Sequence, residues 1–144
     1  MTIEPSCSVH RLIADVAIFA GTRVLLVKYQ DARRYDGQRG WFLPDDFLAY
    51  TEHPEDAARR IARDQTGITI ARPSLKHIES FGNGAWHMAF HYASAVSGRT
   101  KVVPGPNVAA FEWFDLRKLP PADQVAHHGW ALDVIKEISK GRRR

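Results

Sequence analysis

Apolar positions in the first part of the chain predict a β-hairpin. Residues 12–20 and 23–29 are two runs rich in β-branched and aliphatic side chains, and Gly21-Thr22 separates them. Two such runs around a short glycine turn are typical of antiparallel strands. Residues 30–40, which follow the second run, are polar and contain glycine, so they predict a surface loop.

The segment after this loop predicts a short strand and then a helix. Residues 41–44, WFLP, are apolar and indicate a strand that stops at its proline. In residues 52–67, His53 suits the N-cap, and Pro54 suits the first helical position, where no backbone N–H is needed. Acidic residues in the first turn interact favourably with the positive N-terminal end of the helix dipole, and Gly67 is suited to the left-handed conformation that ends a helix.

The second half of the chain predicts further strands and a closing helix. Segments 68–82 and 86–98 have the pattern of a second strand pair around the glycine-containing turn 82–84. A loop with two prolines then precedes a short strand at 110–115. Residues 125–140 predict an amphipathic helix, with apolar residues at helical spacing: Val125, Leu132, Ile135 and Ile138.

The order of these predicted elements is β-β-β-α-β-β-β-α. A sheet with a helix on each face buries the apolar side of every element, so we expect an α/β fold, an α/β/α sandwich with a mixed β-sheet. A length of 144 residues with 44% hydrophobic content fits one domain, 1–144. Its core is expected over about residues 10–140, between a short N-terminus and a basic C-terminal tail.

The charge balance argues against nucleic acid as a partner. The chain has 20 Lys and Arg residues against 16 Asp and Glu residues, a net charge of +4. Part of this excess is the terminal run Arg142, Arg143 and Arg144, and the rest of the chain is close to neutral. Binding to nucleic acid through a general basic surface is therefore not expected.

Cysteine content and hydropathy predict the compartment. Cys7 is the only cysteine, so no intramolecular disulfide can form and a reducing environment is expected. The N-terminus lacks the basic and apolar pattern of a signal peptide, and no apolar run reaches the length of a membrane span. We therefore expect a cytoplasmic protein without a membrane partner.

Three positions of the predicted helix share one face. Ile61, Asp64 and Gln65 stand at i, i+3 and i+4, so their side chains are expected to converge on one point. The alternative for Asp64 is a solvated ion pair with Arg60, which would contribute roughly 0.2–0.5 kcal/mol.

Around this helix the chain resembles the Nudix superfamily, and the resemblance covers roughly residues 10–140. The Nudix box runs Gly, five residues, Glu, seven residues, Arg-Glu, an aliphatic residue, any residue, Glu-Glu, any residue, Gly and an aliphatic residue. Aligned on its last two positions, the box keeps its residue type at Glu52, Arg60, Gly67 and Ile68. Other residues stand at the first glycine (Asp46), at the glutamate after the arginine (Ile61) and at the paired glutamates (Asp64 and Gln65). The flanking segments VLLVKYQ, WFLP, HMAFHYASAV and FEWFDLRKLP are also similar to the family.

The resemblance implies an α/β/α sandwich and the hydrolysis of a nucleoside diphosphate linked to a further group. In the family, the box glutamates bind Mg²⁺ or Mn²⁺, which neutralises the pyrophosphate and activates water. Carried over to this chain, it implies Glu52, Arg60 and Asp64 as catalytic residues. It implies Asp64, Asp46 and Gln65 as metal ligands.

Substitutions in the box predict an altered and impaired metal site. Ile61 has no ligand atom, Gln65 has only a neutral carbonyl oxygen, and Asp64 is one methylene shorter than glutamate. Asp45 and Asp46, just before the helix, either supply replacement carboxylates or serve as turn residues after the proline. Two functions stay open: an impaired diphosphohydrolase that uses Mg²⁺ or Mn²⁺, or a non-catalytic module that binds a nucleotide-like ligand or a protein partner and needs no metal.

Substrate contacts are expected outside the box. Arg33, Arg34 and Arg39 in the polar loop are candidates for phosphate contacts, and a solvated loop is the alternative. Trp86 is the main candidate for stacking on a base; Trp41 and Phe81 are others, and aromatic residues in a domain of this size are also typical of a core.

Two histidines and two glutamates complete the candidates. His87 and His91 alternate with apolar residues, so they share one sheet face and either line a pocket or are partly buried with local hydrogen bonds. Glu79 and Glu112 are candidates for a further metal ligand or base, with solvated strand positions as the alternative. Relatives in the family often form dimers, so the resemblance is compatible with a homodimer.

Overall fold

The computed structural model describes residues 10–35, 37–83 and 85–140. Its strands are β1 (His10–Ala20), β2 (Arg23–Tyr29), β3 (Asp45–Phe47), β4 (Ser74–Asn83), β5 (Ala85–Ala95) and β6 (Val108–Asp115). Its helices are α1 (Pro54–Thr66) and α2 (Ala126–Ser139), with short 3₁₀ turns η2 (Ala32–Tyr35) and η3 (Ala122–Gln124). The strand order is β4-β5-β1-β2-β6, and β3 pairs with β1. Because β1 is parallel to β5 and antiparallel to β2 and β3, the sheet is mixed, as predicted.

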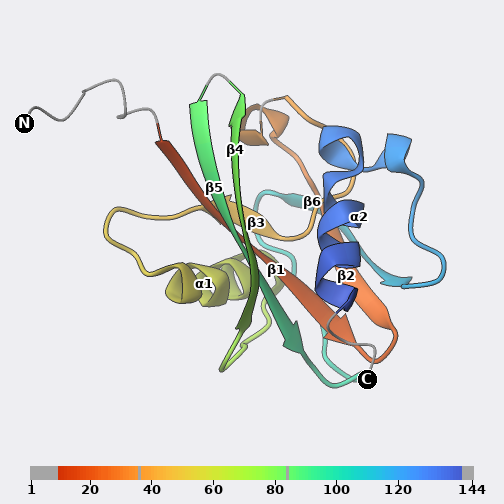
Figure 1. The fold of residues 1–144 in the computed structure, drawn as a ribbon. Coiled ribbons are helices and arrows are strands. Elements are labelled where there is room, and N and C mark those ends of the chain that lie inside the picture. The colour runs from red at the N-terminus through yellow and green to blue at the C-terminus, as the bar shows by residue number, and fades with distance from the viewer. Residues whose placement is uncertain (1–9, 36, 84, 141–144) are drawn as a thin grey trace, which may run out of the picture.

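Alternation along β1 builds two core layers. Val16 and Ile18 point to one face and pack with α1, whereas Ala17 and Phe19 point to the other face and pack with α2. All four side chains are 0–1% exposed. The two helices therefore cover opposite faces of the sheet, and the predicted α/β/α sandwich is confirmed (Figure 1).

Helix α1 begins and ends at the residues that the sequence predicts. The His53 imidazole Nδ1 accepts a hydrogen bond from the Glu55 backbone N–H at 3.0 Å, and Pro54 occupies the first turn. Gly67 ends the helix with φ of 70°, and its N–H donates to the Arg63 carbonyl. A left-handed conformation at this point suits glycine, because no Cβ is present to clash.

Two predicted strand boundaries are wrong. Trp41 and Phe42 form only isolated bridges, to Val125 and Val27, and β3 starts just beyond the expected segment, at Asp45. In the segment expected as a strand from residue 68, only the part from Ser74 onward is strand. The preceding Ile68 and Ile70 are 3% and 4% exposed, because they pack as irregular chain into the α1 core. In these two segments the apolar residues are buried, but they are not part of paired strands.

The start of α2 also differs from a regular helix. Val125 lies before the helix, and His127, His128 and Gly129 have φ values of 54°, 57° and 90°. Regular helical residues that pack on the sheet follow this left-handed segment. The predicted turn at 82–84 joins β4 to β5, although Gly84, like Cys7 and the C-terminal arginines, lies outside the described residues. Within the described residues, no helix is both long and apolar enough to cross a membrane.

Candidate functional site

Arg60 on α1 clamps the segment that leads into the helix. Its Nε and Nη2 donate to the two Glu52 carboxylate oxygens at 2.9 and 3.0 Å, and Nη2 also donates to the Phe47 carbonyl at 3.0 Å. The Ala49 N–H donates to Glu52 Oε1 at 2.9 Å. Hydrogen bonds from Arg60 lower the pKa of Glu52, and the Glu52 carboxylate raises the pKa of Arg60. The hydrogen bonds of Arg60 and Glu52 therefore hold the segment before α1 against the helix.

Ile61 belongs to the core. Its side chain is 1% exposed and packs in the cluster that joins α1 to the sheet, which includes Ala58 and Val16. The expected convergence of positions 61, 64 and 65 on one point is therefore wrong. Position 61 points toward the sheet, and only positions 64 and 65 present polar groups.

Gln65 closes a ring of hydrogen bonds with Tyr29 and Asp45. The Tyr29 hydroxyl donates to Gln65 Oε1 at 2.7 Å, and Gln65 Nε2 donates to the Asp45 carbonyl at 2.7 Å. The Asp45 N–H donates to the Tyr29 oxygen at 3.0 Å. Both ends of the amide are thus used within the protein, and they tie α1 to β2 and β3.

The two aspartates predicted as metal ligands have different surroundings. The Asp64 side chain is 54% exposed and pairs with Arg63 at 3.2 Å, so the expected pairing with Arg60 is wrong. Asp46 Oδ1 accepts from the Phe47 N–H at 2.8 Å, and Oδ2 lies 3.6 Å from Arg60 Nη1. Asp46 therefore makes the local hydrogen bond of a turn residue and also forms an ion pair with Arg60 on α1. Within the part of the chain that the structure describes, no group of three or more His, Cys, Asp or Glu side chains is arranged to hold a metal ion.

The residues predicted to contact substrate lie in two places. Arg33 forms a local pair with Asp31 at 3.0 Å in an exposed loop, and Arg39 is also exposed. The backbone of Arg34 lies in η2, and its side chain lies outside the described part. Trp86 is 48% exposed on β5, where its Nε1 donates to Ser80 Oγ at 2.8 Å.

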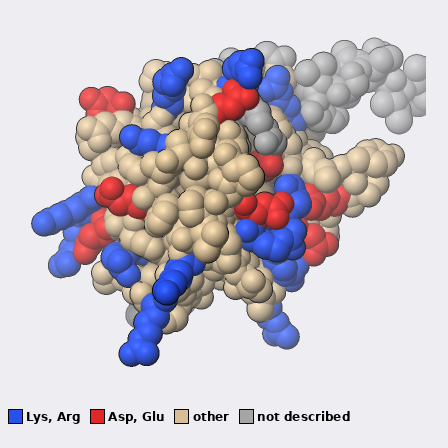
Figure 2. Space-filling model, turned by 180° about the vertical axis from the view of Figure 1, so that it is seen from behind, with Lys and Arg blue, Asp and Glu red and all other residues tan. Residues whose placement is uncertain are grey.

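Other aromatic and acidic candidates have structural partners or stay exposed. Trp41 is 8% exposed and packs against Phe114 with ring centroids 5.1 Å apart, so it belongs to the α2 core. Phe81 stacks on His87 at 4.9 Å. Glu112 is exposed on β6. On the surface opposite the view of Figure 1, charges of both signs are interspersed (Figure 2).

A buried polar cluster lies on the α2 face of the sheet. His91 Nδ1 bonds Asp15 Oδ2 at 2.6 Å, and His91 Nε2 bonds Glu79 Oε1 at 2.9 Å. Glu79 Oε1 also accepts from Trp130 Nε1 at 3.1 Å. Burial raises the pKa of Asp15, although its bond to His91 opposes this effect. The prediction of a partly buried His91 with local hydrogen bonds is wrong, because His91 is 1% exposed and its partners Asp15 and Glu79 lie 76 and 12 positions away along the chain. Sequence reasoning also missed Asp15, the one charge within the apolar run LIADVAIF.

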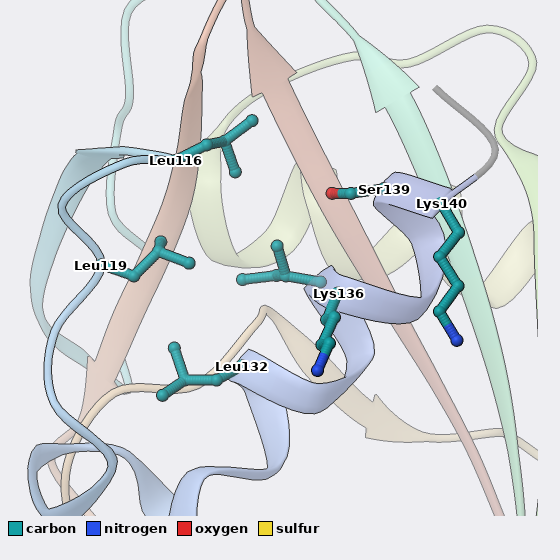
Figure 3. Close-up of a pocket in the computed structure, with 7 residues that line it drawn as sticks. Leu116, Leu119, Leu132, Lys136, Ser139 and Lys140 are labelled. Carbon is teal, nitrogen blue, oxygen red and sulfur yellow. The ribbon is translucent and has the colours of Figure 1, made fainter. Parts of the chain in front are cut away.

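A hollow of about 460 Å³ lies between α2 and the segment after β6. Its floor is apolar, and lysine ammonium groups lie at its rim (Figure 3). The lining residues are Leu116, Leu119, Leu132, Ile135, Lys136, Ser139 and Lys140. None of the residues predicted for the metal or the substrate is among them.

Comparisons with known proteins agree with the fold. The NUDIX domain model matches residues 9–133. A MutT NUDIX hydrolase from Burkholderia pseudomallei is 26% identical, with a TM-score of 0.71 and coverage of 89% of this chain and 97% of that one. Comparison with curated proteins gives no match.

Two more distant structures share the fold. The NUDIX domain of Shewanella oneidensis NrtR, in complex with ADP ribose, is 18% identical, with a TM-score of 0.76 and coverage of 99% and 94% of the two chains. A binary complex of Ap4A hydrolase from C. elegans is 15% identical, with a TM-score of 0.71 and coverage of 92% and 97%.

Proposed function

Because this chain belongs to the NUDIX domain family, we propose that it binds a nucleotide-like ligand with a diphosphate group without catalysing its hydrolysis. The observation that carries this proposal is the hydrogen-bond ring of Gln65, Tyr29 and Asp45. It places a fully bonded neutral amide where the family box has a metal-binding glutamate.

The surrounding residues do not fit the metal cluster of the family. Divalent ions that act on pyrophosphate need hard, charged oxygen ligands. Ile61 is enclosed in the core, the Gln65 amide is occupied, and the Glu52 carboxylate is held by Arg60. If each lost ligand costs about 3 kcal/mol in the transition state, two losses slow hydrolysis on the order of 10⁴-fold.

The proposed ligand class is a nucleoside diphosphate joined to a further group. ADP ribose, which the NrtR NUDIX structure contains, is a member of this class and the natural first probe. We assign phosphate contacts to Arg33, Arg34 and Arg39 and base stacking to Trp86. The half-exposed indole of Trp86 and the exposed guanidinium groups of Arg33 and Arg39 are chemically suited to these contacts.

A second candidate is a slow diphosphohydrolase that uses Asp46 and Asp64 with Mg²⁺ or Mn²⁺. Asp46 Oδ2 lies 3.6 Å from Arg60 Nη1, and after Glu52, the main cause, the charges of Asp46 and Asp64 also raise the pKa of Arg60. Substrate phosphates often supply the remaining ligands of Mg²⁺. This candidate predicts metal-dependent turnover that Asp64→Asn abolishes.

Calorimetry with ADP ribose in EDTA, together with a phosphate-release assay in Mg²⁺ or Mn²⁺, separates the candidates. We expect binding in EDTA and turnover well below 1 s⁻¹, the lower end of the usual enzyme range of roughly 1–10³ s⁻¹. Metal-dependent turnover at any rate that Asp64→Asn abolishes would refute the non-catalytic proposal in favour of the second candidate, and turnover of about 1 s⁻¹ or more would refute the impaired site as well. A lack of binding to ADP ribose and to a panel of nucleotide sugars and dinucleoside polyphosphates would refute the ligand class.

Arg33→Ala tests the assigned phosphate contact. Its matched control is Arg117→Ala, because Arg117 pairs with Asp115 at 3.2 Å just as Arg33 pairs with Asp31, two residues earlier, and both arginine side chains are highly exposed. Loss of a charged hydrogen bond would weaken binding about tenfold in Arg33→Ala and leave it unchanged in Arg117→Ala. Equal affinities in both variants would remove Arg33 from the site.

A further inference from the structure

We propose that Asp15, His91 and Glu79 form a buried proton-binding site whose proton holds the start of α2 on the sheet. This site lies on the α2 face, whereas Ile61 and the rest of the α1 core lie on the opposite face. The inference does not depend on the proposed ligand.

Hydrogen-bond chemistry requires the proton. His91 is 1% exposed, and each of its ring nitrogens faces a carboxylate oxygen, at 2.6 Å for Asp15 and 2.9 Å for Glu79. An ionised carboxylate only accepts hydrogen bonds, and a neutral imidazole has one N–H. Both bonds can be present together only when the group of three holds an additional proton. Its most direct position is on His91 as imidazolium.

Strand register brings these groups together. Asp15 on β1 is the parallel partner of His91 on β5, and His91 is the antiparallel partner of His77 on β4. Residues that face each other across paired strands point to the same side of the sheet. Asp15, His91 and His77 therefore form a row across three strands beneath α2. Glu79 lies on the same face of β4, two residues after His77.

Glu79 connects this row to α2. The same oxygen, Oε1, accepts from His91 Nε2 and from Trp130 Nε1, and the rings of His91 and Trp130 lie 5.6 Å apart. The Glu79 side chain is 35% exposed, whereas the side chains of Asp15 and His91 are 1% exposed. When the proton leaves, Glu79 is the member that can turn toward water, and its bond to Trp130 is then lost.

The segment before Trp130 is strained. His127 and His128 adopt left-handed conformations, which side chains with a Cβ disfavour, and Gly129 continues the segment. The His127 N–H is held by Gln38 Oε1 at 2.9 Å, and its ring lies 6.1 Å from Trp130. Release of Trp130 removes one of the contacts that hold this segment, so the first turn of α2 is the part expected to open.

Other charged and titratable groups face His91 from the neighbouring strands and from α2. From β4, the His77 ring stacks on the His91 ring with centroids 5.9 Å apart. His87 lies on the same face of β5, where its Nδ1 bonds the Ala85 carbonyl. From β3, Asp45 is the register partner of Asp15 and adds a carboxyl group on this face. From α2, the facing group is the neutral indole of Trp130, and His127 lies beyond it.

The sign of the pH dependence follows from the pKa of His91. Burial lowers this pKa, but the bonds and charges of Asp15 and Glu79 outweigh burial and raise it above the ordinary value of 6.5. Because the folded-state pKa is raised, the proton stabilises the contact between α2 and the sheet fully at pH values below 6.5, the ordinary pKa of histidine. This stabilisation is lost as the pH rises through the higher, folded-state pKa.

NMR titration of the wild-type His91 ring tests the proton directly. We expect both ring nitrogens to remain protonated at pH 6.5 and the imidazolium signals to disappear only as the pH rises above this ordinary histidine value. A ring that titrates at or below pH 6.5 would overturn the proposal.

Hydrogen exchange tests the connection to α2. Protection factors of the first α2 turn, normalised to α1 amides, are expected to fall at least tenfold when the pH passes the folded pKa of His91. Glu79→Gln should abolish this drop, because the amide donates to a neutral His91 and its carbonyl still accepts from Trp130. The control His87→Gln should keep it. Protection in wild type that is independent of pH, or a drop that persists in Glu79→Gln, would overturn the proposal.

Discussion

Gln65 is a structural tie because its amide provides one donor and one acceptor in the required order. Nε2 donates to the Asp45 carbonyl, and Oε1 accepts from the Tyr29 hydroxyl. A glutamate at this position would bring a negative oxygen toward the Asp45 carbonyl and lose the donor. Gln65 therefore joins α1 to β2 and β3.

Gln65→Glu is expected to destabilise the protein by about 1–3 kcal/mol, the usual penalty for a part-buried group left without its partner. Urea unfolding at pH 8 measures this change. Tyr29→Phe disrupts the same ring, so the double variant should lose less than the sum of the two single losses. Additive losses would show that the two side chains act separately, contrary to this expectation.

Ile61→Glu is expected to unfold the protein or to destabilise it by roughly 3 kcal/mol or more, because it buries a charge without a partner. Ile61→Val is the matched control and should cost about 0.5–1.5 kcal/mol. Thermal melting with and without Mn²⁺ measures both effects. The prediction fails if Ile61→Glu with Gln65→Glu folds and gains melting temperature with Mn²⁺, since that would mean that position 61 reaches a metal.

At the scale of elements, Arg60 and Glu52 join the segment before α1 to the helix. The side chains of the pair are 26% and 16% exposed, and the bonds are bidentate. Such a pair in a partly enclosed position stabilises more than an exposed surface pair. It fixes the course of the chain between β3 and α1 through hydrogen bonds to Phe47 and Ala49.

Glu52→Gln should therefore weaken the acid dependence of stability. Because Arg60 lowers the pKa of Glu52, the pair stabilises the fold above the ordinary glutamate pKa of about 4.3. That contribution is lost as the pH falls through the lower, folded-state value. We expect wild type to lose about 1–2 kcal/mol more than Glu52→Gln between pH 6 and pH 3, as measured by urea unfolding. The exposed pair partner Glu137→Gln is the control and should behave like wild type.

Local signals predicted some elements well and others poorly. The caps of α1 depend on residues within the helix, so His53, Pro54 and Gly67 were enough to place it. The start of α2 depends on a distant contact, because Gln38, 89 positions away along the chain, accepts the hydrogen bond of the left-handed His127 N–H. The segment 68–73 buries apolar side chains as irregular chain, without strand partners. Hydrophobicity alone cannot distinguish this kind of burial from burial within a paired strand.

At the scale of the whole molecule, the fold class followed from the order and period of the apolar runs, and the polar sites did not. The His91 bond to Asp15 joins residues 76 positions apart, and the Tyr29 bond to Gln65 joins residues 36 apart. Such partners depend on strand register and helix rotation, which a sequence pattern does not specify. The result is a sheet with the altered box on one face and a buried proton site on the other.

The proposed ligand contacts predict that the ligand stabilises the domain to the same extent with and without divalent metal. If ADP ribose binds the folded state alone, a concentration one hundred times Kd should stabilise the whole domain by about 2.7 kcal/mol. The gain should be the same in EDTA and in Mg²⁺, because the proposed contacts are guanidinium and indole groups rather than metal ligands. Chemical unfolding with and without the ligand measures it, and Trp86→Ala should reduce the gain while Phe111→Ala, a similarly exposed aromatic on β6, should not. A gain that appears only with Mg²⁺ would instead place a metal between the protein and the diphosphate, and Asp46 and Asp64 would be the residues to substitute next.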